Sequence, residues 1–201
     1  MKQNFKPGTM IYPLPAVLVS CGATPDEYNV LTVSWTGTIC SNPPMCYVSI
    51  RPERYSYDII KRTGAFVINL TNRDLEYATD FCGVKSGREC NKFEMAKLTP
   101  QKSEFVDAPI ILEAPVSIEC RVVDVKPLGS HDMFIAEVVN VVVDDSYMQE
   151  NGQLDMAAMN LLAYNHGQYF DVSNPRGFFG WSIKKKKKQR DPEEEIFFDH
   201  S

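Results

Sequence analysis

Residues 29–44 read Asn-Val-Leu-Thr-Val-Ser-Trp-Thr-Gly-Thr-Ile-Cys-Ser-Asn-Pro-Pro. The segment begins with strand-like alternation, changes to small hydroxyl residues around Trp35, and ends in the Pro43-Pro44 pair. A strand that only packs against a core has little use for so many hydroxyl groups beside an indole. A ligand that is flat and apolar at one end and polyhydroxylated or phosphorylated at the other would use them all. Flavin mononucleotide (FMN) has that shape.

Short strand-like runs lie around and beyond this segment. They are rich in β-branched or aromatic residues and are bounded by Gly, Pro, Asn or Asp. The runs cover residues 15–21, 30–35, 45–50 and 65–70. Between the last two, residues 56–64 have apolar side chains at helical spacing, with Ser56 as a candidate N-cap and Gly64 as the closing residue. Residues 72–81 are a second candidate for a short helix.

The second half of the chain predicts a long hairpin. Residues 116–122 alternate between apolar and polar side chains, and residues 133–143 are apolar on both faces over much of their length. The turn at 127–130 joins these strands in antiparallel fashion and leaves His131 at the mouth of the hairpin. The chain lacks the regular strand–helix alternation of a doubly wound sheet. It therefore predicts a mainly β fold, a closed barrel with short peripheral helices.

Length and composition indicate one domain and a charged tail. The 201 residues are 44% hydrophobic and 23% charged, with a formal net charge of -5. This acidic balance does not favour binding to nucleic acid or to an anionic membrane. The sequence shows neither an apolar run of membrane-spanning length nor a secretory signal, so we expect a cytoplasmic protein. We place the domain at residues 1–183 and a solvated tail, rich in lysine and glutamate, at 184–201.

The six cysteines show no metal-binding pattern. None forms a C-x-x-C pair, and only three histidines accompany them, so we predict no metal site. Buried free thiols are the plain interpretation. The alternative is a redox-active thiol beside a flavin, for which Cys40 and Cys82 are the better candidates. The chain also lacks the G-x-G-x-x-G, G-x-x-x-x-G-K-[ST], H-E-x-x-H and G-x-S-x-G motifs.

Two segments combine the features of an anion-binding site. Arg51 and Arg54 lie between a predicted strand and the helix start that carries Ser56, and free backbone N–H groups at a helix N-terminus attract phosphate. Residues 80–93 form a glycine-punctuated segment with a serine and three cations, Lys92 among them. Such loops turn backbone amides and positive groups toward an anion. The plainer interpretation is a polar surface connection with solvated charges.

Three motifs together resemble the flavin reductase-like family. They read N-V-L-T-V-S-W-T-G-T-I-C-S-N-P-P at 29–44, V-S-I-R-P-E-R-Y-S-Y at 48–57 and D-F-C-G-V-K-S-G-R-E-C-N-K-F at 80–93. Within the family they are most similar to the flavoredoxins, and the similarity covers residues 13–170. The resemblance implies a split β-barrel that binds FMN without a covalent bond. It also implies a homodimer with the flavin near the subunit interface.

The same resemblance implies which residues contact FMN. Asn29 and Trp35 are the leading candidates, and Thr32 and Ser34 would add hydrogen bonds from the strand. Lys92 would reach the phosphate or the pyrimidine edge of the ring. The remaining contacts that the resemblance implies are Ser56, His131 and Tyr164. The anion-binding pattern adds Arg51 and Arg54.

This chain departs from the family pattern at three places. Ser56 stands where the flavoredoxins tend to have a threonine, and it keeps the hydroxyl group. Asn91 precedes Lys92 where an aspartate is more frequent, and Tyr164 replaces a phenylalanine that faces the flavin. Taken alone, Trp35 would be read as a core aromatic and Lys92 as an exposed charge.

Three functions remain open at this stage. The resemblance implies an FMN-dependent oxidoreductase that passes electrons from transiently bound NAD(P)H to a flavin, a metal chelate or a protein. No catalytic residue is named, because the flavin itself carries the hydride chemistry; Lys92 and His131 are candidates to stabilise the reduced ring. The second hypothesis is an FMN electron carrier that a partner protein reduces. The third is a flavin-free barrel that binds nucleic acid through the lysines at 184–188, against which the acidic balance counts.

Overall fold

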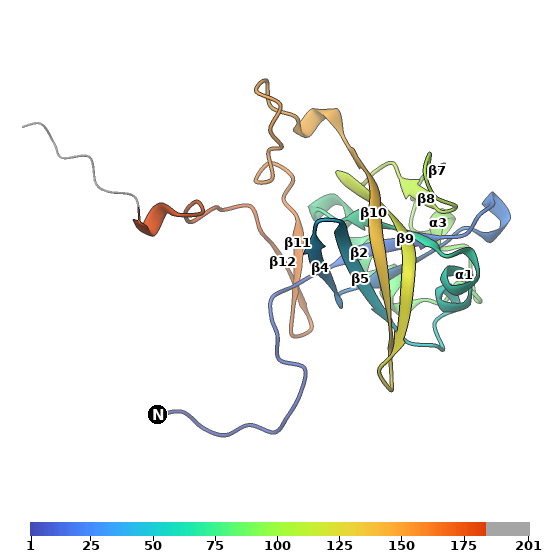
Figure 1. Ribbon diagram of the computed structural model, residues 1–201, viewed down its shortest axis with the longest axis horizontal. Coiled ribbons are helices and arrows are strands. Elements are labelled where there is room, and N and C mark those ends of the chain that lie inside the picture. The colour runs from blue at the N-terminus through green and yellow to red at the C-terminus, as the bar shows by residue number, and fades with distance from the viewer. Residues whose placement is uncertain (184–201) are drawn as a thin grey trace, which may run out of the picture.

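A computed structural model describes residues 1–183, and one seven-stranded sheet forms its centre (Figure 1). Neighbouring strands all pair antiparallel, in the order β3-β2-β6-β9-β10-β5-β4. Their bounds are β2 Val17–Cys21, β3 Asn29–Val33, β4 Thr36–Ser41, β5 Pro44–Ile50, β6 Ala65–Leu70, β9 Val116–Pro127 and β10 Asp132–Val143. The expected mainly β fold is confirmed.

The sheet closes into a barrel because its two edge strands are consecutive in the chain. β3 and β4 lie at opposite edges of the sheet, yet only Ser34 and Trp35 separate them. The link passes beside β5, where the Ser49 backbone N–H donates to the Trp35 carbonyl at 2.9 Å. The expected barrel is confirmed, but strand pairing does not join β3 to β4 or β5 within residues 1–183. The strand expected at 30–35 ends at Val33.

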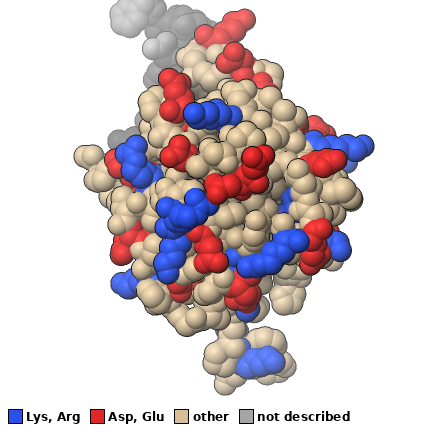
Figure 2. Space-filling view, turned by 90° about the vertical axis from the view of Figure 1, so that its right-hand side faces the viewer, with Lys and Arg blue, Asp and Glu red and all other residues tan. Residues whose placement is uncertain are grey.

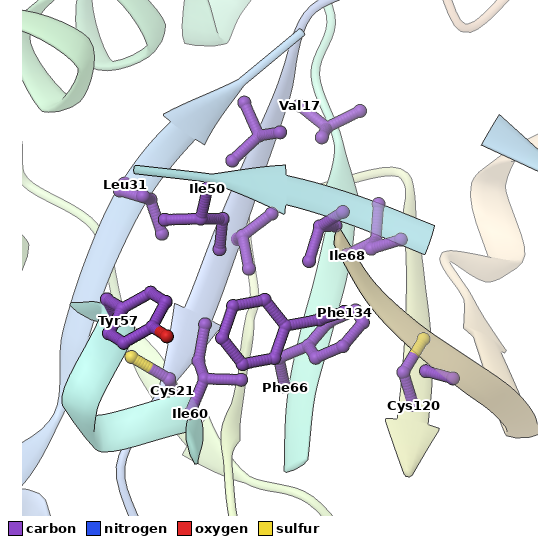
Figure 3. Packing of buried hydrophobic residues seen from close by; sticks show 14 of the residues in the cluster. Val17, Cys21, Leu31, Ile50, Tyr57, Ile60, Phe66, Ile68, Cys120 and Phe134 are labelled. Atoms are coloured by element: carbon purple, nitrogen blue, oxygen red, sulfur yellow. The ribbon is translucent and has the colours of Figure 1, made fainter. Parts of the chain in front are cut away.

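Apolar side chains from the sheet and from helix α1 (Tyr55–Thr63) fill the barrel (Figure 3). Phe66 on β6 and Phe134 on β10 are fully buried. Tyr57 of α1 packs edge-on against Phe134, with ring centroids 5.3 Å apart. Each side chain of this size contributes about 1.5–3 kcal/mol when fully buried. The helix therefore belongs to the barrel core and holds its own N-terminus at the barrel.

Two more helices cover the outer face of β2 and β3. Helices α2 (Glu76–Val84) and α3 (Lys92–Met95) pack against a cluster that includes Leu18 and Val30. This explains why all five residues of β2 are buried although neighbouring side chains point to opposite faces. The helix expected at 72–81 is present, but it starts as the 3₁₀ turn η2 (Arg73–Leu75) and continues as α2.

Helix α1 confirms the expected helix at 56–64 and corrects its start. It ends at Gly64, which has a φ of 67° and therefore occupies the left-handed region that glycine adopts most easily. Arg54, not Ser56, is the N-cap residue. The turn that closes with Arg54 N–H donating to the Arg51 carbonyl at 3.0 Å starts the helix early. Ser56 is thus free to bond elsewhere.

The long hairpin is confirmed, and its first strand is longer than expected. Pairing between β9 and β10 continues to Pro127, past the predicted end at 122. The Leu128 N–H donates to the His131 carbonyl at 2.9 Å and closes the turn. The remaining strands are β1 Leu14–Pro15, β11 Leu162–Asn165 and β12 Gln168–Asp171 in a three-stranded sheet, and β7 Pro100–Lys102 with β8 Pro109–Ile111. The run 15–21 is therefore divided between two sheets.

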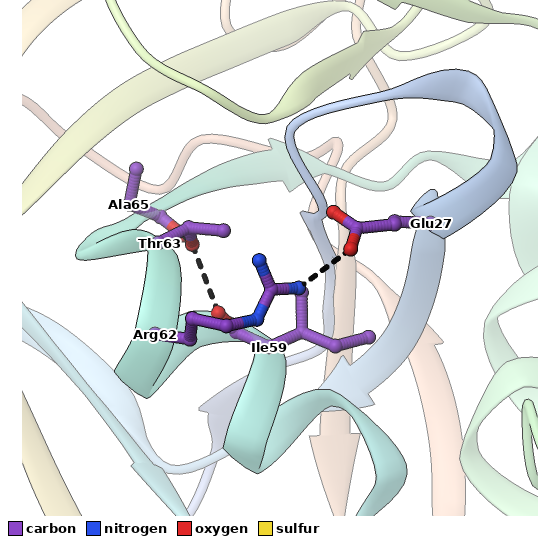
Figure 4. Close-up of polar contacts among 5 residues, drawn as sticks. All are labelled: Glu27, Ile59, Arg62, Thr63 and Ala65. Carbon is purple, nitrogen blue, oxygen red and sulfur yellow. Dashed lines mark hydrogen bonds and ion pairs between the residues drawn. The ribbon is translucent and has the colours of Figure 1, made fainter.

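An ion pair ties the end of α1 to the turn that leads into β3 (Figure 4). Arg62 Nη2 lies 2.8 Å from Glu27 Oε1, which belongs to the 3₁₀ turn η1 (Pro25–Glu27). In the last turn of α1, Thr63 Oγ1 donates to the Ile59 carbonyl at 3.0 Å. An exposed ion pair contributes about 0–1 kcal/mol. Its main consequence is positional, because β3 begins two residues after Glu27.

The surface carries both signs of charge. On the face shown in Figure 2, lysine and arginine side chains alternate with aspartate and glutamate. Such a face has no field of one sign that would attract a polyanion. The helices found among residues 1–183 are too short and too polar to cross a bilayer. The charged tail expected at 184–201 lies outside the described residues.

A buried polar network centred on Asn69 joins strands across the barrel wall. The Asn69 Nδ2 group donates to the Leu18 carbonyl at 3.0 Å and to Ser20 Oγ at 2.9 Å. Its Oδ1 atom accepts from Ile111 N–H at 3.0 Å and from Ser117 Oγ at 2.7 Å. Asn69 is completely buried. One side chain therefore satisfies groups on β2, β8 and β9.

We predict that Asn69→Ala destabilises the barrel by about 2–4 kcal/mol, because several buried polar groups lose their partner. Urea unfolding of the two proteins measures the difference. Gln101→Ala, an exposed residue of β7, is the control and should stay within about 0.5 kcal/mol of the parent. Equal stability of the Asn69 variant and the control would contradict the assigned role of the network.

Candidate functional site

Two adjoining pockets open where the barrel closes. The helix-end pocket has a volume of about 390 Å³ and lies at the start of α1. The barrel-edge pocket has about 150 Å³ and lies between β3 and β5. Leu31, Arg51 and Arg54 line both pockets, which therefore form one cleft. The sequence-predicted contact residues, with the exception of Tyr164, all line this cleft.

A buried hydrogen bond joins β3 to α1 in the helix-end pocket. Asn29 Nδ2 donates to Ser56 Oγ at 2.5 Å, and the two residues are 4% and 1% exposed. Because Asn29 is the first residue of β3 and Ser56 is the second of α1, this bond sets the helix start against the edge strand. Asn29 Oδ1 accepts no hydrogen bond from residues 1–183. It is available to a ligand.

Lys92 brings a buried positive charge to the same pocket. The residue is 4% exposed, and its Nζ donates to the carbonyls of Cys82 at 3.0 Å and Lys85 at 3.2 Å. These carbonyls lie at the C-terminal end of α2, where the helix dipole favours a cation. Burial lowers the pKa of Lys92, and the charge of Arg54 lowers it further. The exposed charge expected from Lys92 alone is wrong, because α3 directs the side chain beneath α2.

Two arginines lie where the pockets meet. Arg54 Nη1 donates to the Gly83 carbonyl at 3.0 Å and so links the start of α1 to the end of α2. Arg51 pairs with Glu53 at 3.3 Å, and half of its side chain remains exposed. An exposed pair of this kind holds its members weakly. The Arg51 guanidinium can therefore turn to an anionic ligand at little cost.

An aromatic pair marks the barrel-edge pocket. The rings of Trp35 and His131 lie 4.3 Å apart at an angle of 42°, and Trp35 is 37% exposed. His131 Nδ1 lies 2.9 Å from Ser130 Oγ. Burial lowers the pKa of His131, and the positive charge of Arg51 lowers it further. Both effects favour the neutral imidazole, and the pocket offers flat aromatic surfaces beside the arginines.

Comparison with known proteins assigns the chain to a family. A family model described as "Flavin reductase like domain" matches residues 9–173. The chain belongs to the flavin reductase-like family. Its structure is similar to flavoredoxin of Desulfovibrio vulgaris (Miyazaki F), with a TM-score of 0.84 and 31% identity over 92% of this chain and 100% of that one.

Two further proteins are similar to this chain at lower identity and over a smaller share of its length. A protein from Shewanella frigidimarina NCIMB 400, described as having a split barrel domain, gives a TM-score of 0.73 at 24% identity, over 82% of this chain and 85% of that one. The expected split barrel is thereby confirmed. The NADPH-flavin oxidoreductase of Streptomyces viridifaciens is 28% identical over 111 residues, 54% of this chain and 56% of that protein.

Tyr164 lies apart from the other residues that the family resemblance indicated. It belongs to β11 in the three-stranded sheet. Its ring packs against Tyr12 at 6.4 Å and against Tyr169 at 5.8 Å between centroids. In the single chain it does not line the cleft. The resemblance placed it there by position in the sequence alone, whereas pairing of β11 with β1 decides where the ring lies.

The hydroxyl of Thr32, an expected flavin contact, already has a hydrogen-bond partner in the chain. Thr32 Oγ1 donates to the Thr79 carbonyl on α2, so this hydroxyl can meet a ligand only as a hydrogen-bond acceptor. The cleft is also lined by residues that sequence reasoning missed. Tyr55 and Gly87 line the helix-end pocket, and Ser49 lines the barrel-edge pocket. Ser49 and Arg51 are two residues apart, and that period-two spacing could have identified Ser49.

The cysteines do not favour a redox role in the cleft. Cys82 is completely buried, and burial raises its pKa to about 11. A reactive thiol needs the opposite shift, because the thiolate is the nucleophile. Cys40 is half-buried in β4 and does not line the cleft. Residues 1–183 hold no cluster of His, Cys, Asp and Glu suited to a metal ion.

We predict opposite effects on the pKa of His131 from Arg51 and Glu53, the two charged residues that influence it most. Arg51→Gln should raise the pKa of His131, because a positive charge that disfavours the imidazolium is removed. Glu53→Gln should lower it further, because Glu53 raises this pKa. NMR titration of the imidazole C–H signals, assigned with His131→Asn, measures both shifts. No change in either variant would mean that desolvation alone sets the value.

Proposed function

We propose that the cleft binds FMN without a covalent bond and that the protein is an oxidoreductase of the flavin reductase type. It would take electrons from NAD(P)H and pass them through FMN to a flavin, a metal chelate or a protein acceptor. Family membership supports the flavin.

The buried ammonium of Lys92 is the observation that carries the proposal. Within residues 1–183 Lys92 forms no ion pair, and two backbone carbonyls are its hydrogen-bond partners. Keeping a charge away from water without a counter-ion is costly. A ligand with an anionic group, either a phosphate or the edge of a reduced flavin ring, would balance this charge. FMN has both groups.

The rest of the cleft fits the remaining parts of FMN. Arg51 and Arg54 supply further positive charge between the pockets, and Asn29 Oδ1 supplies an acceptor. Trp35 and His131 supply flat surfaces of the kind on which a tricyclic ring packs. Bound flavin would supply the hydride and electron chemistry, as cofactors do. The residues of the chain would bind it, orient it and hold positive charge near it.

Transient docking of NAD(P)H follows from the absence of a dinucleotide-binding motif in the sequence. No residue of the cleft needs to act as a general acid or base, so we propose no catalytic side chain. We also propose a homodimer, as the family resemblance implies, and a cytoplasmic location, as expected from the sequence. The net charge of -5 and the flavin reductase-like fold leave the nucleic-acid hypothesis without support.

The alternative is an FMN electron carrier that a partner protein reduces, with little NAD(P)H activity of its own. The similarity to flavoredoxin of Desulfovibrio vulgaris (Miyazaki F) favours keeping it. The two functions differ in the electron donor and use the same cleft. Evidence for FMN in the cleft would therefore support both.

We predict that Lys92→Ala and Trp35→Ala each weaken FMN binding about tenfold or more. The first removes charge-assisted contacts worth about 1.5–3 kcal/mol, and the second removes aromatic packing. Quenching of FMN fluorescence during titration measures the affinity, and circular dichroism checks the fold. Lys102→Ala, an exposed residue of β7, is the control. Unchanged affinity in both site variants would remove the site assignment.

Rapid anaerobic mixing of the FMN-loaded protein with NADH or NADPH separates the two functions. We expect the visible flavin absorption to bleach with at least one of the two donors, because the open cleft gives a nicotinamide access to the ring. Free FMN at the same concentration is the control. Absence of bleaching, with normal reduction by dithionite, would favour the electron carrier.

A further inference from the structure

A third pocket adjoins the cleft on the far side of Trp35. This apolar pocket has a volume of about 330 Å³, which is within the range of pockets that bind small organic ligands. Trp35 and Ser49 line both the apolar pocket and the barrel-edge pocket, so the two spaces share a wall. Residues 8–11, which precede the first strand, form another wall.

The lining of the apolar pocket carries no charged side chain. Its walls are mainly aliphatic, aromatic and methionine side chains, with Met10, Leu14 and Met133 around the Trp35 ring. The neighbouring cleft, in contrast, is lined by several cations. An anionic ligand would lose its hydration in the apolar pocket without gaining a counter-ion. The pocket therefore suits an uncharged ligand, and the pyrophosphate of a nicotinamide dinucleotide is excluded from it.

Three hydroxyl-bearing residues, Thr9, Tyr47 and Ser49, line the apolar pocket. Two of them belong to strand β5. Tyr47 and Ser49 are two residues apart on β5, so their side chains lie on the same face of the strand. Neither hydroxyl makes a hydrogen bond within residues 1–183, and both residues line the pocket. An apolar space with a few convergent hydrogen-bonding groups is typical of a site for a small ring compound. Hydroxyl donors select ligands with carbonyl oxygens.

We propose that this pocket binds an uncharged quinone as the electron acceptor. The quinone ring would pack against Trp35, and a quinone carbonyl would accept a hydrogen bond from Tyr47. This inference rests on the proposed function, since the two-electron-reduced flavin in the cleft is the reductant. Two electrons and two protons convert the quinone to a hydroquinone. The electrons come from the reduced flavin, which returns to its oxidised form, and the protons come from the flavin and from solvent.

Binding is tested first, without any flavin. The chain has two tryptophans, so Trp181→Phe leaves Trp35 as the fluorescent reporter in the pocket wall. Menadione, an uncharged naphthoquinone, should quench this fluorescence in a saturable way. A sulfonated naphthoquinone should bind about tenfold more weakly or worse, because its charge has no partner in the pocket.

Three variants in this background test the geometry. Tyr47→Phe should weaken menadione binding about fivefold through loss of one hydrogen bond. Met133→Phe, which fills part of the pocket, should weaken it by about tenfold or more. Met156→Phe, an exposed site away from the pocket, is the matched control and should change nothing. FMN affinity should be unchanged in all three.

Reoxidation then tests the acceptor role. The FMN-loaded protein is reduced with dithionite and mixed with each quinone, and the rate at which the flavin absorption returns should follow the affinities measured by quenching. Equal rates and equal quenching with both quinones, or no effect of Tyr47→Phe and Met133→Phe, would overturn the proposal. A different result for Met133→Phe would also overturn the proposal. If this variant changed the monomer–dimer equilibrium in sedimentation but left menadione binding intact, a second copy of the chain would be the occupant of the pocket. Failure to bind FMN would refute only the proposed function, since quenching is read on the apoprotein.

Discussion

The return of the sheet to itself across the Ser34–Trp35 link is the constraint on which the barrel and its site depend. Six steps separate β3 from β4 in the strand order, and a flat sheet would hold those edges about 29 Å apart. The two linking residues span at most about 11 Å between the strand ends. The sheet must therefore curve until its edges meet. The gap that remains beside β3 and β5 becomes the cleft.

The polar character of the cleft follows from the same closure. At the gap, edge-strand backbone and side chains are not buried by a neighbouring strand, so they can face a ligand. Asn29 begins β3 at this edge, and its bond to Ser56 brings the start of α1 there as well. The Lys92 side chain lies beneath α2, where two carbonyls at the end of that helix accept hydrogen bonds from its Nζ. The start of α1, the end of α2 and the edge strand β3 therefore lie together at the cleft. Trp35 then separates this charged cleft from the uncharged pocket lined by Tyr47.

Local signals in the sequence predicted much of this fold. Runs rich in β-branched or aromatic residues predicted β2, β3, β5 and β6 but not β4, and the hairpin followed from the patterns of its two strands and the turn at 127–130. Gly64 closes α1 as expected, because the left-handed conformation there suits a residue without a side chain. The order of three motifs predicted the family, and all expected contact residues except Tyr164 line the cleft. These features depend on neighbours in the chain, or on a pattern that the family shares.

The sequence by itself determined most strands of the central sheet, the end of α1 and the residue types at the barrel edge. Tertiary structure alone decided how those side chains are used. The Thr32 hydroxyl bonds to Thr79, 47 residues away, and Lys92 is buried because the end of α2 lies above it. Tyr164 follows the register of β11 rather than the cleft. In each case the partner is distant in the chain, so the choice between solvent, core and ligand is made only when the barrel closes.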